Sequence, residues 1–238
     1  MKRKALIIGA PDSSIPGVNA DMENYKSFLL GPIGGLWRPD EITVLKNPSS
    51  LAARAALAEL KSADYSFAVF AGHGAYSVNR RTTFVNINSA ETMDVDDFKV
   101  GAAKHTLIVD ACRNHVVEPI AEQRAILKAA MDSYTSVERA RQIFDDHVTK
   151  CAPGFAGLYS CADNESAGDT SKGGLFSHTL LTVAWDWSEN RAQSANVLQV
   201  DHALNAASPL VIARSGRRQN PDFYFSRPSP RFPFAVRP

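Results

Sequence analysis

The sequence predicts an α/β fold, with a mostly parallel central sheet covered by helices on both faces, in one domain over residues 1–238. Short, continuously apolar runs alternate along the chain with segments whose apolar residues recur at helical spacing, a pattern typical of parallel sheets buried on both faces. The chain is also long enough for one sizeable core. Its hydrophobic fraction of 45% and charged fraction of 21% are those of an ordinary globular protein.

Five short segments predict the strands of this sheet. Each is an apolar run of strand length, and the first ends at Gly, Pro and Asp, residues that favour turns. The predicted strands are residues 5–9, 41–46, 66–70, 106–109 and 155–160.

Helices are predicted between these strands. The first carries apolar side chains at helical spacing, the second is alanine-rich and opens after a proline and two serines, and the third follows two glycines. The predicted helices are residues 19–30, 50–61 and 175–187.

Two stretches depart from this alternation. Residues 113–153 form a long charged insertion, within which residues 121–130 and 137–147 could each be helical. From Arg214 onward the chain is rich in Arg, Pro and Phe. Because proline cannot join a central ladder, we expect extended edge structure there. Such an edge pairs poorly with a second copy, so we expect a monomer.

Composition excludes several classes of protein. The formal net charge is +1, with no basic run or one-sided tail, so no nucleic-acid or membrane partner is expected. Three cysteines are too few for a secreted disulfide framework, and we expect a reducing, cytoplasmic location. The N-terminal apolar run is too short for a signal peptide, and no stretch approaches the roughly 18 apolar residues of a membrane span.

A histidine and a cysteine follow neighbouring predicted strands. His73, flanked by Gly72 and Gly74, comes after the third strand, and Cys112 comes after the fourth. The carboxyl ends of parallel strands meet at one edge of the sheet, where catalysis gathers. A thiolate is a strong nucleophile and a nearby imidazole can take its proton, so this pair predicts nucleophilic catalysis. The N–H groups of Gly72 and Cys112 are expected to bind the developing oxyanion.

The segment Asp110-Ala111-Cys112-Arg113-Asn114, with the upstream Gly-His-Gly, resembles the catalytic motifs of caspases and of the related metacaspases and orthocaspases. Residues 17–24, 159–167, 173–177 and 219–221 resemble further segments of that family, but residues 75–93 and 113–153 do not. The resemblance implies a caspase-like three-layer sandwich and a cysteine endopeptidase that acts on polypeptides.

The resemblance also bears on specificity. Caspases hold a substrate Asp with arginines and with a Gln two residues before the Cys, but here Ile15 and Asp110 stand at such positions. Asp21 supplies a second carboxylate, and Ser160 and Asp163 are expected to line the same pocket. Carboxylates bind a guanidinium strongly, so we expect cleavage after Arg, with Lys second. Alternatively, Asp21 only caps a helix and Asp163 lies on a solvated loop.

The insertion after the nucleophile predicts regulation by cleavage. In similar proteins this region is often cut, so we expect it to cover the cleft until it is cleaved by the enzyme itself or by an upstream protease. A helical hairpin packed on the sheet is the alternative. The candidate cleavage residues are Arg113, Arg124, Lys128, Arg139, Arg141 and Lys150.

No cofactor is expected. Many metacaspases bind calcium, but the acidic cluster Asp94, Asp96 and Asp97 is preceded by a basic loop and falls short of the six to eight oxygens that calcium takes. Cys151 and Cys161 are too far apart in sequence for a compact zinc pair with Cys112 and His115. The first loop also lacks a glycine-rich phosphate cradle. The remaining alternative to a peptidase is a catalytically silent caspase-like scaffold.

Overall fold

The computed structural model describes residues 1–238 except 80, 114–133, 191–193 and 227–230. Its central sheet has six strands, and every neighbouring pair is parallel except the pair of β12 and β8. The mostly parallel sheet is therefore confirmed. In spatial order the strands are β12 (Asp222–Phe225), β8 (Gly154–Tyr159), β7 (Lys104–Asp110), β3 (Tyr65–Gly72), β1 (Arg3–Ala10) and β2 (Ile42–Lys46).

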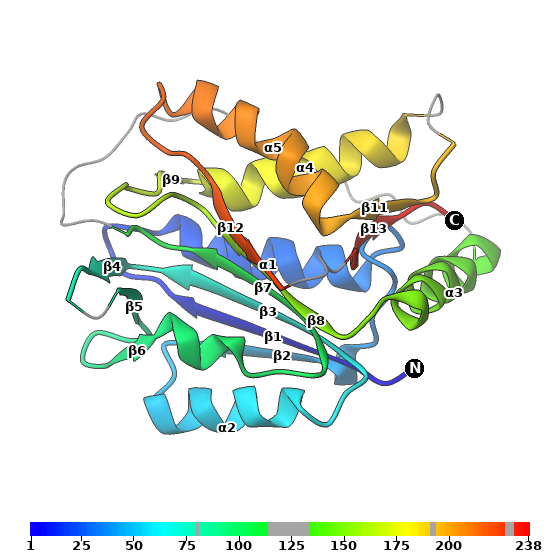
Figure 1. Ribbon diagram of the computed structural model, residues 1–238, viewed down its shortest axis with the longest axis horizontal. Coiled ribbons are helices and arrows are strands. Elements are labelled where there is room, and N and C mark those ends of the chain that lie inside the picture. The colour runs from blue at the N-terminus through cyan, green and yellow to red at the C-terminus, as the bar shows by residue number, and fades with distance from the viewer. Residues whose placement is uncertain (80, 114–133, 191–193, 227–230) are drawn as a thin grey trace.

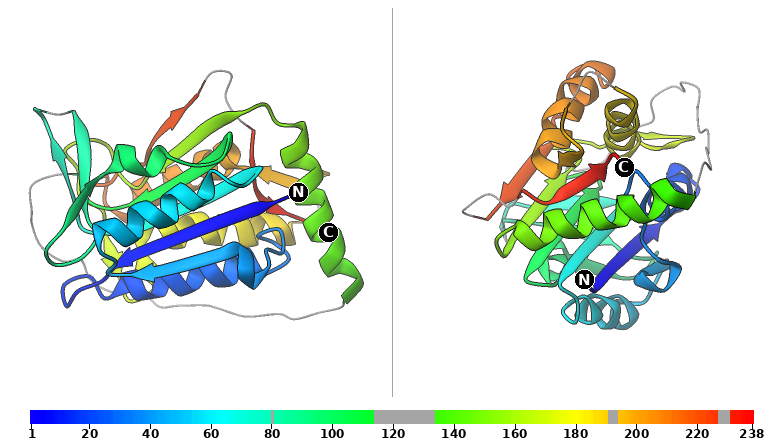
Figure 2. Two further views of the ribbon diagram at one scale, coloured as in Figure 1. Left: turned by 90° about the horizontal axis from the view of Figure 1, so that it is seen from below. Right: turned by 90° about the vertical axis from the view of Figure 1, so that its right-hand side faces the viewer.

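Helices cover both faces of the sheet, which confirms the three-layer sandwich (Figures 1 and 2). One face carries α1 (Gly17–Leu30), α4 (Leu175–Glu189) and α5 (Val200–Arg214), and α3 (Tyr134–Lys150) packs into the same layer near the amino ends of the strands. The other face carries α2 (Ser50–Leu60) and the short 3-10 helix η2 (Val95–Lys99). A second 3-10 helix, η1 (Pro39–Glu41), precedes β2.

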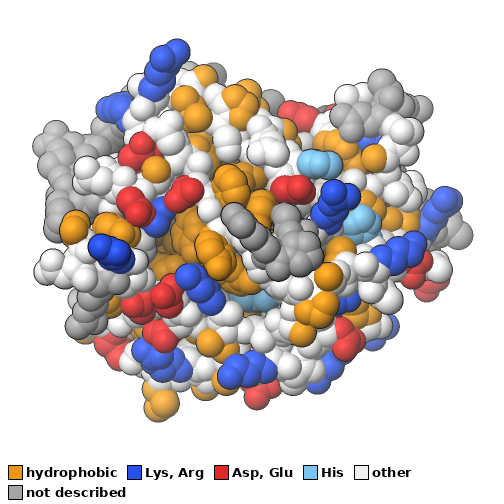
Figure 3. All heavy atoms as spheres, viewed as in Figure 1, with side chains coloured by type: hydrophobic (Ala, Val, Ile, Leu, Met, Phe, Trp, Pro, Cys, Tyr) orange, Lys and Arg blue, Asp and Glu red, His pale blue; other side chains and the backbone are white. Residues whose placement is uncertain are grey.

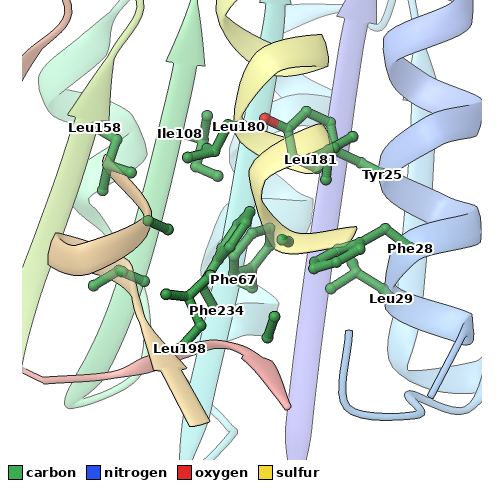
Figure 4. Close-up of a cluster of buried hydrophobic side chains, with 14 of the residues drawn as sticks. Tyr25, Phe28, Leu29, Phe67, Ile108, Leu158, Leu180, Leu181, Leu198 and Phe234 are labelled. Atoms are coloured by element: carbon green, nitrogen blue, oxygen red, sulfur yellow. The ribbon is translucent and has the colours of Figure 1, made fainter. Parts of the chain in front are cut away.

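Alternation along the strands divides the core into two layers. In β1, Ala5 and Ile7 join the cluster beneath α1 and α4, whereas Leu6 and Ile8 join the cluster beneath α2. Successive side chains of a strand point to opposite faces, so a continuous apolar run fills both layers. Figure 4 shows the larger cluster, in which Phe67 of β3 lies among side chains from α1, α4 and β13 (Pro233–Val236).

The second half of the predicted insertion belongs to this core. Ala140, Phe144 and Val148 recur every four residues along α3, so they form one buried stripe. Phe144 packs edge-on against Trp37 and Tyr65. Helix α3 is therefore packed on the sheet, as the alternative of a packed helical hairpin expects for this part of the insertion. The predicted helix over residues 121–130 lies outside the described residues.

Several elements were not predicted. Residues 74–94 form a small antiparallel sheet of β4 (Gly74–Ser77), β5 (Thr82–Asn86) and β6 (Thr92–Asp94), and α5 continues through Pro209. Two further pairs are β9 (Asp169–Thr170) with β10 (Gly173–Gly174), and β11 (Val197–Gln199) with β13. These strands are too short to leave an alternating pattern. The expected edge structure after Arg214 is present as β12.

None of the helices in the described part of the chain is both long and apolar enough to cross a membrane.

Candidate active site

The register of three neighbouring strands brings the predicted catalytic residues together. Ala71 of β3 pairs with Asp110 of β7, and His73 and Cys112 each follow by two residues. On the other side of β3, Gly72 pairs with the last residue of β1. The loop after β1, His73 and Cys112 therefore lie side by side at the carboxyl edge of the sheet, toward the left of Figure 1.

His73 contacts the loop after β1. Its Nε2 lies 2.9 Å from Oδ2 of Asp12 and 3.1 Å from Oγ of Ser14. The imidazole is 38% exposed, so a substrate can reach it. His73 sits between the last residue of β3 and the first of β4, and the antiparallel pairing of β4 with β5 anchors the chain directly after it.

Cys112 is half-buried and faces the loop after β8. Its Sγ donates a hydrogen bond to the carbonyl of Ala167 at 3.5 Å and accepts one from the Ala167 N–H at 3.3 Å. Burial raises the pKa of the Cys112 thiol, because the charged form loses hydration. Over the residues that the structure describes, no hydrogen bond joins Cys112 to the His73 ring. The thiol is therefore engaged with the main chain of Ala167 rather than with the imidazole.

The two glycines around His73 occupy different places. Gly72 is the last residue of β3 and lies opposite Ala10 of β1. Gly74 packs directly against the nucleophile segment, because a Cβ built there would lie 2.6 Å from the carbonyl oxygen of Cys112. Gly74 is therefore packed against the segment that carries Cys112. The expectation that the N–H groups of Gly72 and Cys112 bind an oxyanion stays a prediction.

Asp21 of α1 and Asp110 at the end of β7 are buried side by side beneath β10. Oδ2 of Asp21 accepts a hydrogen bond of 2.9 Å from the N–H of Gly174, and Oδ2 of Asp110 accepts one of 2.9 Å from the N–H of Ser177. Burial raises the pKa of both carboxyls, and the neighbouring Asp110 raises that of Asp21 further. The buried Oδ1 of Asp21 has no hydrogen-bond partner among the described residues.

A third carboxylate, Asp169 of β9, completes the cluster. Its Oδ2 accepts a hydrogen bond of 3.1 Å from the N–H of Gly17, the first residue of α1. Burial raises the pKa of Asp169 to about 6, and the charge of Asp110 contributes to the rise, while His73 opposes it. Three carboxyl groups thus gather beside His73 and Cys112, and in the described part of the chain none of them forms an ion pair with Lys or Arg.

Two glycines of the β9–β10 hairpin cover the carboxylates. A Cβ at Gly173 would collide with Oδ1 of Asp21, and a Cβ at Gly174 would collide with Asp110. Gly173 also has a φ of 116°, which L side chains rarely adopt. Only glycine fits at these positions, and in this state the hairpin fills the space beside Asp21 and Asp110.

Ser160 and Asp163 have different surroundings. The side chain of Ser160 also acts on Asp110, where it opposes the rise of that carboxyl's pKa, so it lies beside this residue of the expected pocket. Ser160 is buried, and its Oγ donates to the carbonyl of Ala111 at 3.1 Å and accepts from the Ala111 N–H at 3.2 Å, so it steadies the residue before the nucleophile. The carboxylate of Asp163 forms an ion pair with Arg113. Sequence reasoning missed this pairing because the two residues are distant in the chain.

The structure does not favour four of the candidate cleavage residues. Arg113 is buried, donates to Thr83 at 3.0 Å and pairs with Asp163, so a peptidase could not reach it. Arg141 pairs with Glu41 at 2.6 Å. Residues 139, 141 and 150 lie in α3, whose helical backbone cannot enter a cleft as an extended strand. The remaining candidates, residues 124 and 128, lie outside the described residues.

The acidic cluster before the fourth predicted strand consists of carboxylates that already bind neighbouring groups of the chain. Asp94 accepts a hydrogen bond from Thr82 and caps η2, while Asp96 and Asp97 pair with cationic side chains. Within the described ranges, no group of three or more His, Cys, Asp or Glu residues is arranged to hold a metal ion.

A histidine and a cysteine at the carboxyl ends of adjacent parallel strands are an arrangement in which an imidazole can activate a thiol for nucleophilic attack. The sequence model of the caspase domain family matches residues 2–233, so the chain belongs to the caspase domain family.

Solved structures show the same fold. Caspase-1 from Spodoptera frugiperda aligns with a TM-score of 0.60 and 13% identity, over 94% of this chain and 88% of that one. Protein GSU0716 from Geobacter sulfurreducens aligns with a TM-score of 0.60 and 15% identity, over the whole of both chains. No curated protein matched the sequence.

Proposed function

We propose that this protein is a cysteine endopeptidase that uses His73 and Cys112 to cleave polypeptides after Arg, and less readily after Lys. The observation that carries the proposal is the cluster of Asp21, Asp110 and Asp169 beside the dyad, which has no cationic partner within the described residues.

The energetics of this cluster favour a cationic ligand. Burying a carboxylate without a partner is costly, and the raised pKa values of Asp21 and Asp110 reflect that cost. A guanidinium offers five N–H donors in a planar fork and would pair with several carboxylate oxygens, including the unpartnered Oδ1 of Asp21. The compact ammonium of lysine offers three donors. A substrate Asp would meet like charge and be rejected.

The dyad supplies the chemistry. His73 takes the proton of the Cys112 thiol, and the thiolate attacks the main-chain carbonyl carbon of the substrate arginine. The imidazolium returns the proton to the departing amine as the peptide C–N bond breaks, which leaves an acyl thioester on Cys112. Water, deprotonated by His73, then hydrolyses the thioester and releases the new carboxyl terminus.

Substrate entry requires movement of the β9–β10 hairpin. Gly173 and Gly174 occupy the space beside Asp21 and Asp110, so an incoming arginine displaces them. The loop that carries Ala167, which holds the Cys112 thiol, leads directly into β9. One movement of this segment would therefore open the pocket and release the nucleophile.

Cleavage of a fluorogenic peptide tests the proposal. We expect the wild type to hydrolyse a peptide ending in Arg faster than one ending in Lys, and not to hydrolyse one ending in Asp. Cys112→Ala and His73→Ala should each abolish hydrolysis. Cys151→Ala is the matched control, because Cys151 contacts the main chain of residues 147 and 231 and should leave hydrolysis unchanged. A preference for Asp would contradict the pocket assignment.

We further propose that cleavage within residues 114–133, after Arg124 or Lys128, activates the enzyme. Incubation of the pure protein, followed by sequencing of the fragments, would show whether it cuts itself there or needs an upstream protease. An intact chain with full activity would contradict this regulation.

A catalytically silent scaffold is the second candidate. One observation favours it: Cys112 contacts Ala167 rather than His73. A correctly folded chain that shows no hydrolysis, even after limited cleavage of residues 114–133, would favour this alternative.

We also propose that the protein is a cytoplasmic monomer that binds neither nucleic acid nor membranes. Its cysteines carry free thiols. Prolines flank the edge strand β12 in the sequence. If the protein dimerised instead, β12 would be the expected contact. Figure 3 shows apolar side chains gathered on the face where β12 lies, and Phe223 and Tyr224 of β12 are exposed. Sedimentation equilibrium tests the monomer, and a dimer that Phe223→Asp dissociates would contradict it.

A further inference from the structure

A carboxylate, that of Asp12, lies beside His73 on the side away from Cys112. The strands β1, β3 and β7 are adjacent in that order, and Asp12, His73 and Cys112 follow them at the same edge of the sheet. The histidine therefore lies between the carboxylate and the cysteine, which is the order in which a catalytic triad is arranged.

The carboxylate of Asp12 is held in a fixed orientation. Its Oδ1 accepts hydrogen bonds from the N–H and the hydroxyl of Ser14, both at 2.7 Å, and from the N–H of Ile15 at 3.2 Å. Its Oδ2 is left for Nε2 of His73 at 2.9 Å. The hydrogen bonds from Ser14 are the main reason why the pKa of Asp12 is lowered to about 2, so the group is an anion at neutral pH.

These contacts determine which ring nitrogen carries the proton. An ionised carboxylate can only accept a hydrogen bond, so Nε2 must donate to Asp12. The single hydroxyl proton of Ser14 is used on Asp12, so Ser14 can only accept from Nε2 as well. Nε2 is therefore protonated. In the neutral ring, Nδ1 keeps its lone pair for the proton of Cys112.

We infer that Asp12 is a positioning residue that holds His73 in the tautomer of a general base, so that the site works as an Asp12–His73–Cys112 triad. The inference rests on the proposed peptidase function. When Nδ1 takes the thiol proton, the ring becomes a cation, and the adjacent carboxylate stabilises that charge. Asp12 itself stays ionised and exchanges no proton.

Asp12→Asn is a sharp test because the surrounding donors dictate how the amide must lie. Three donors point at the Oδ1 position, so the amide oxygen of the variant has to occupy it. The amide N–H₂ then faces Nε2 and requires that nitrogen to accept. The ring is forced into the opposite tautomer, with the proton on Nδ1, and cannot act as the base for Cys112.

The experiment combines kinetics with ¹⁵N NMR of the His73 ring in the full-length chain. In Asp12→Asn we expect kcat for an Arg peptide to fall roughly 100-fold or more, the usual contribution of a general base, with KM little changed. The NMR signal should show a protonated Nε2 in the wild type and a protonated Nδ1 in the variant. Ser14→Ala, which removes one of three bonds to Oδ1, should have a smaller effect on kcat.

Asp64→Asn is the matched control. Asp64 is exposed and accepts a hydrogen bond from the backbone N–H of Lys2. It lies at the amino ends of β1 and β3, the opposite end of these strands from Asp12 and His73. We expect it to leave both kcat and the tautomer unchanged. An Asp12→Asn variant that keeps the wild-type tautomer and a kcat within about twofold of wild type would overturn the inference.

The inference can fail separately from the proposed function. The tautomer and the rate at which iodoacetamide alkylates Cys112 need no peptide substrate, and Cys112→Ala gives the background from the other cysteines. If no Arg peptide is cleaved but the tautomer reverses and alkylation slows in Asp12→Asn, the positioning role stands and the specificity is wrong. If Arg peptides are cleaved but neither property changes, the positioning role is wrong.

Discussion

Asp169 accepts a hydrogen bond of 3.1 Å from the backbone N–H of Gly17, and this contact ties β9 to the first turn of α1. Gly17 has no room for a side chain, because a Cβ there would collide with Asp169 and with the carbonyl of Thr170. The third carboxylate of the proposed pocket is thus fixed from two elements, β9 and α1, that are distant in the sequence.

The carboxylate cluster should make stability depend on pH. The pKa of Asp169 is raised from 3.8 to about 6 in the folded chain, so between these values the folded state binds more protons than the unfolded state. Its contribution to the free energy of unfolding is therefore full below the ordinary pKa and is lost as the pH rises through about 6. The contribution of Asp169 should lower Tm by on the order of a few degrees as the pH is raised from 4 to 7.

Asp169→Asn isolates this effect. The amide cannot ionise, so the variant should show a flatter dependence of Tm on pH, while the exposed control Asp64→Asn should follow the wild type. Differential scanning calorimetry across this range measures both. An identical slope in Asp169→Asn and wild type would contradict the assignment.

Neutralising the two deepest carboxylates should separate stability from activity. Asp21→Asn and Asp110→Asn each remove a buried carboxyl that is costly to ionise and has no counter-ion in the described structure, so we expect an unchanged or higher Tm at pH 7. The same variants should lower kcat/KM for an Arg peptide by roughly 30-fold or more, since truncating one member of a buried charge pair costs about 2–5 kcal/mol. A loss of folding together with activity would instead indicate a structural role.

Calcium removal should leave activity unchanged. Asp96 pairs with Lys99 at 2.7 Å, Asp97 pairs with Arg54 at 2.8 Å, and Asp94 caps η2. These partners leave no open set of carboxylate oxygens at the acidic cluster. Hydrolysis of an Arg peptide measured with excess chelator and with added calcium should give the same rate, and a requirement for calcium would contradict this expectation.

Helix α3 should behave as core rather than as a removable insertion. Phe144 is buried against Trp37 and Tyr65, so we expect Phe144→Ala to lower the free energy of unfolding by about 3–5 kcal/mol. Arg139→Ala, at an exposed position of the same helix, should stay within about 0.5 kcal/mol of the wild type. Urea denaturation measures both, and equal effects would place α3 outside the core.

Much of the sheet could be predicted because its signals are local. The strands β1, β3 and β7 are short apolar runs that fill both layers of the core, and this character does not depend on their neighbours. The small sheet of β4, β5 and β6 escaped prediction because it consists of short strands that pair mainly with one another. Helix α5 escaped because Pro209 ordinarily ends a helix, whereas here Ala203, Leu204 and Val211 are buried against the core and the helix continues.

The candidate site divides in the same way. His73 and Cys112 could be placed beside each other from sequence, because each directly follows a predicted strand and parallel strands end at one edge. Asp12 follows the first strand by the same logic, but an Asp in a turn after Pro is too common to single out. Asp163 was expected in the pocket but pairs with Arg113, a contact that sequence spacing does not reveal.

Residue type and order along the chain were enough to predict the layered α/β fold, the family resemblance and the edge of the sheet at which chemistry is expected. Which polar groups meet across that edge could be learned only from the folded chain. The fold set Asp12 against Nε2 of His73, gathered Asp169 with the two buried carboxylates, and turned Arg113 inward. Such pairings depend on strand register and on side-chain direction at the ends of strands, and a shift of a single residue would change every one of them.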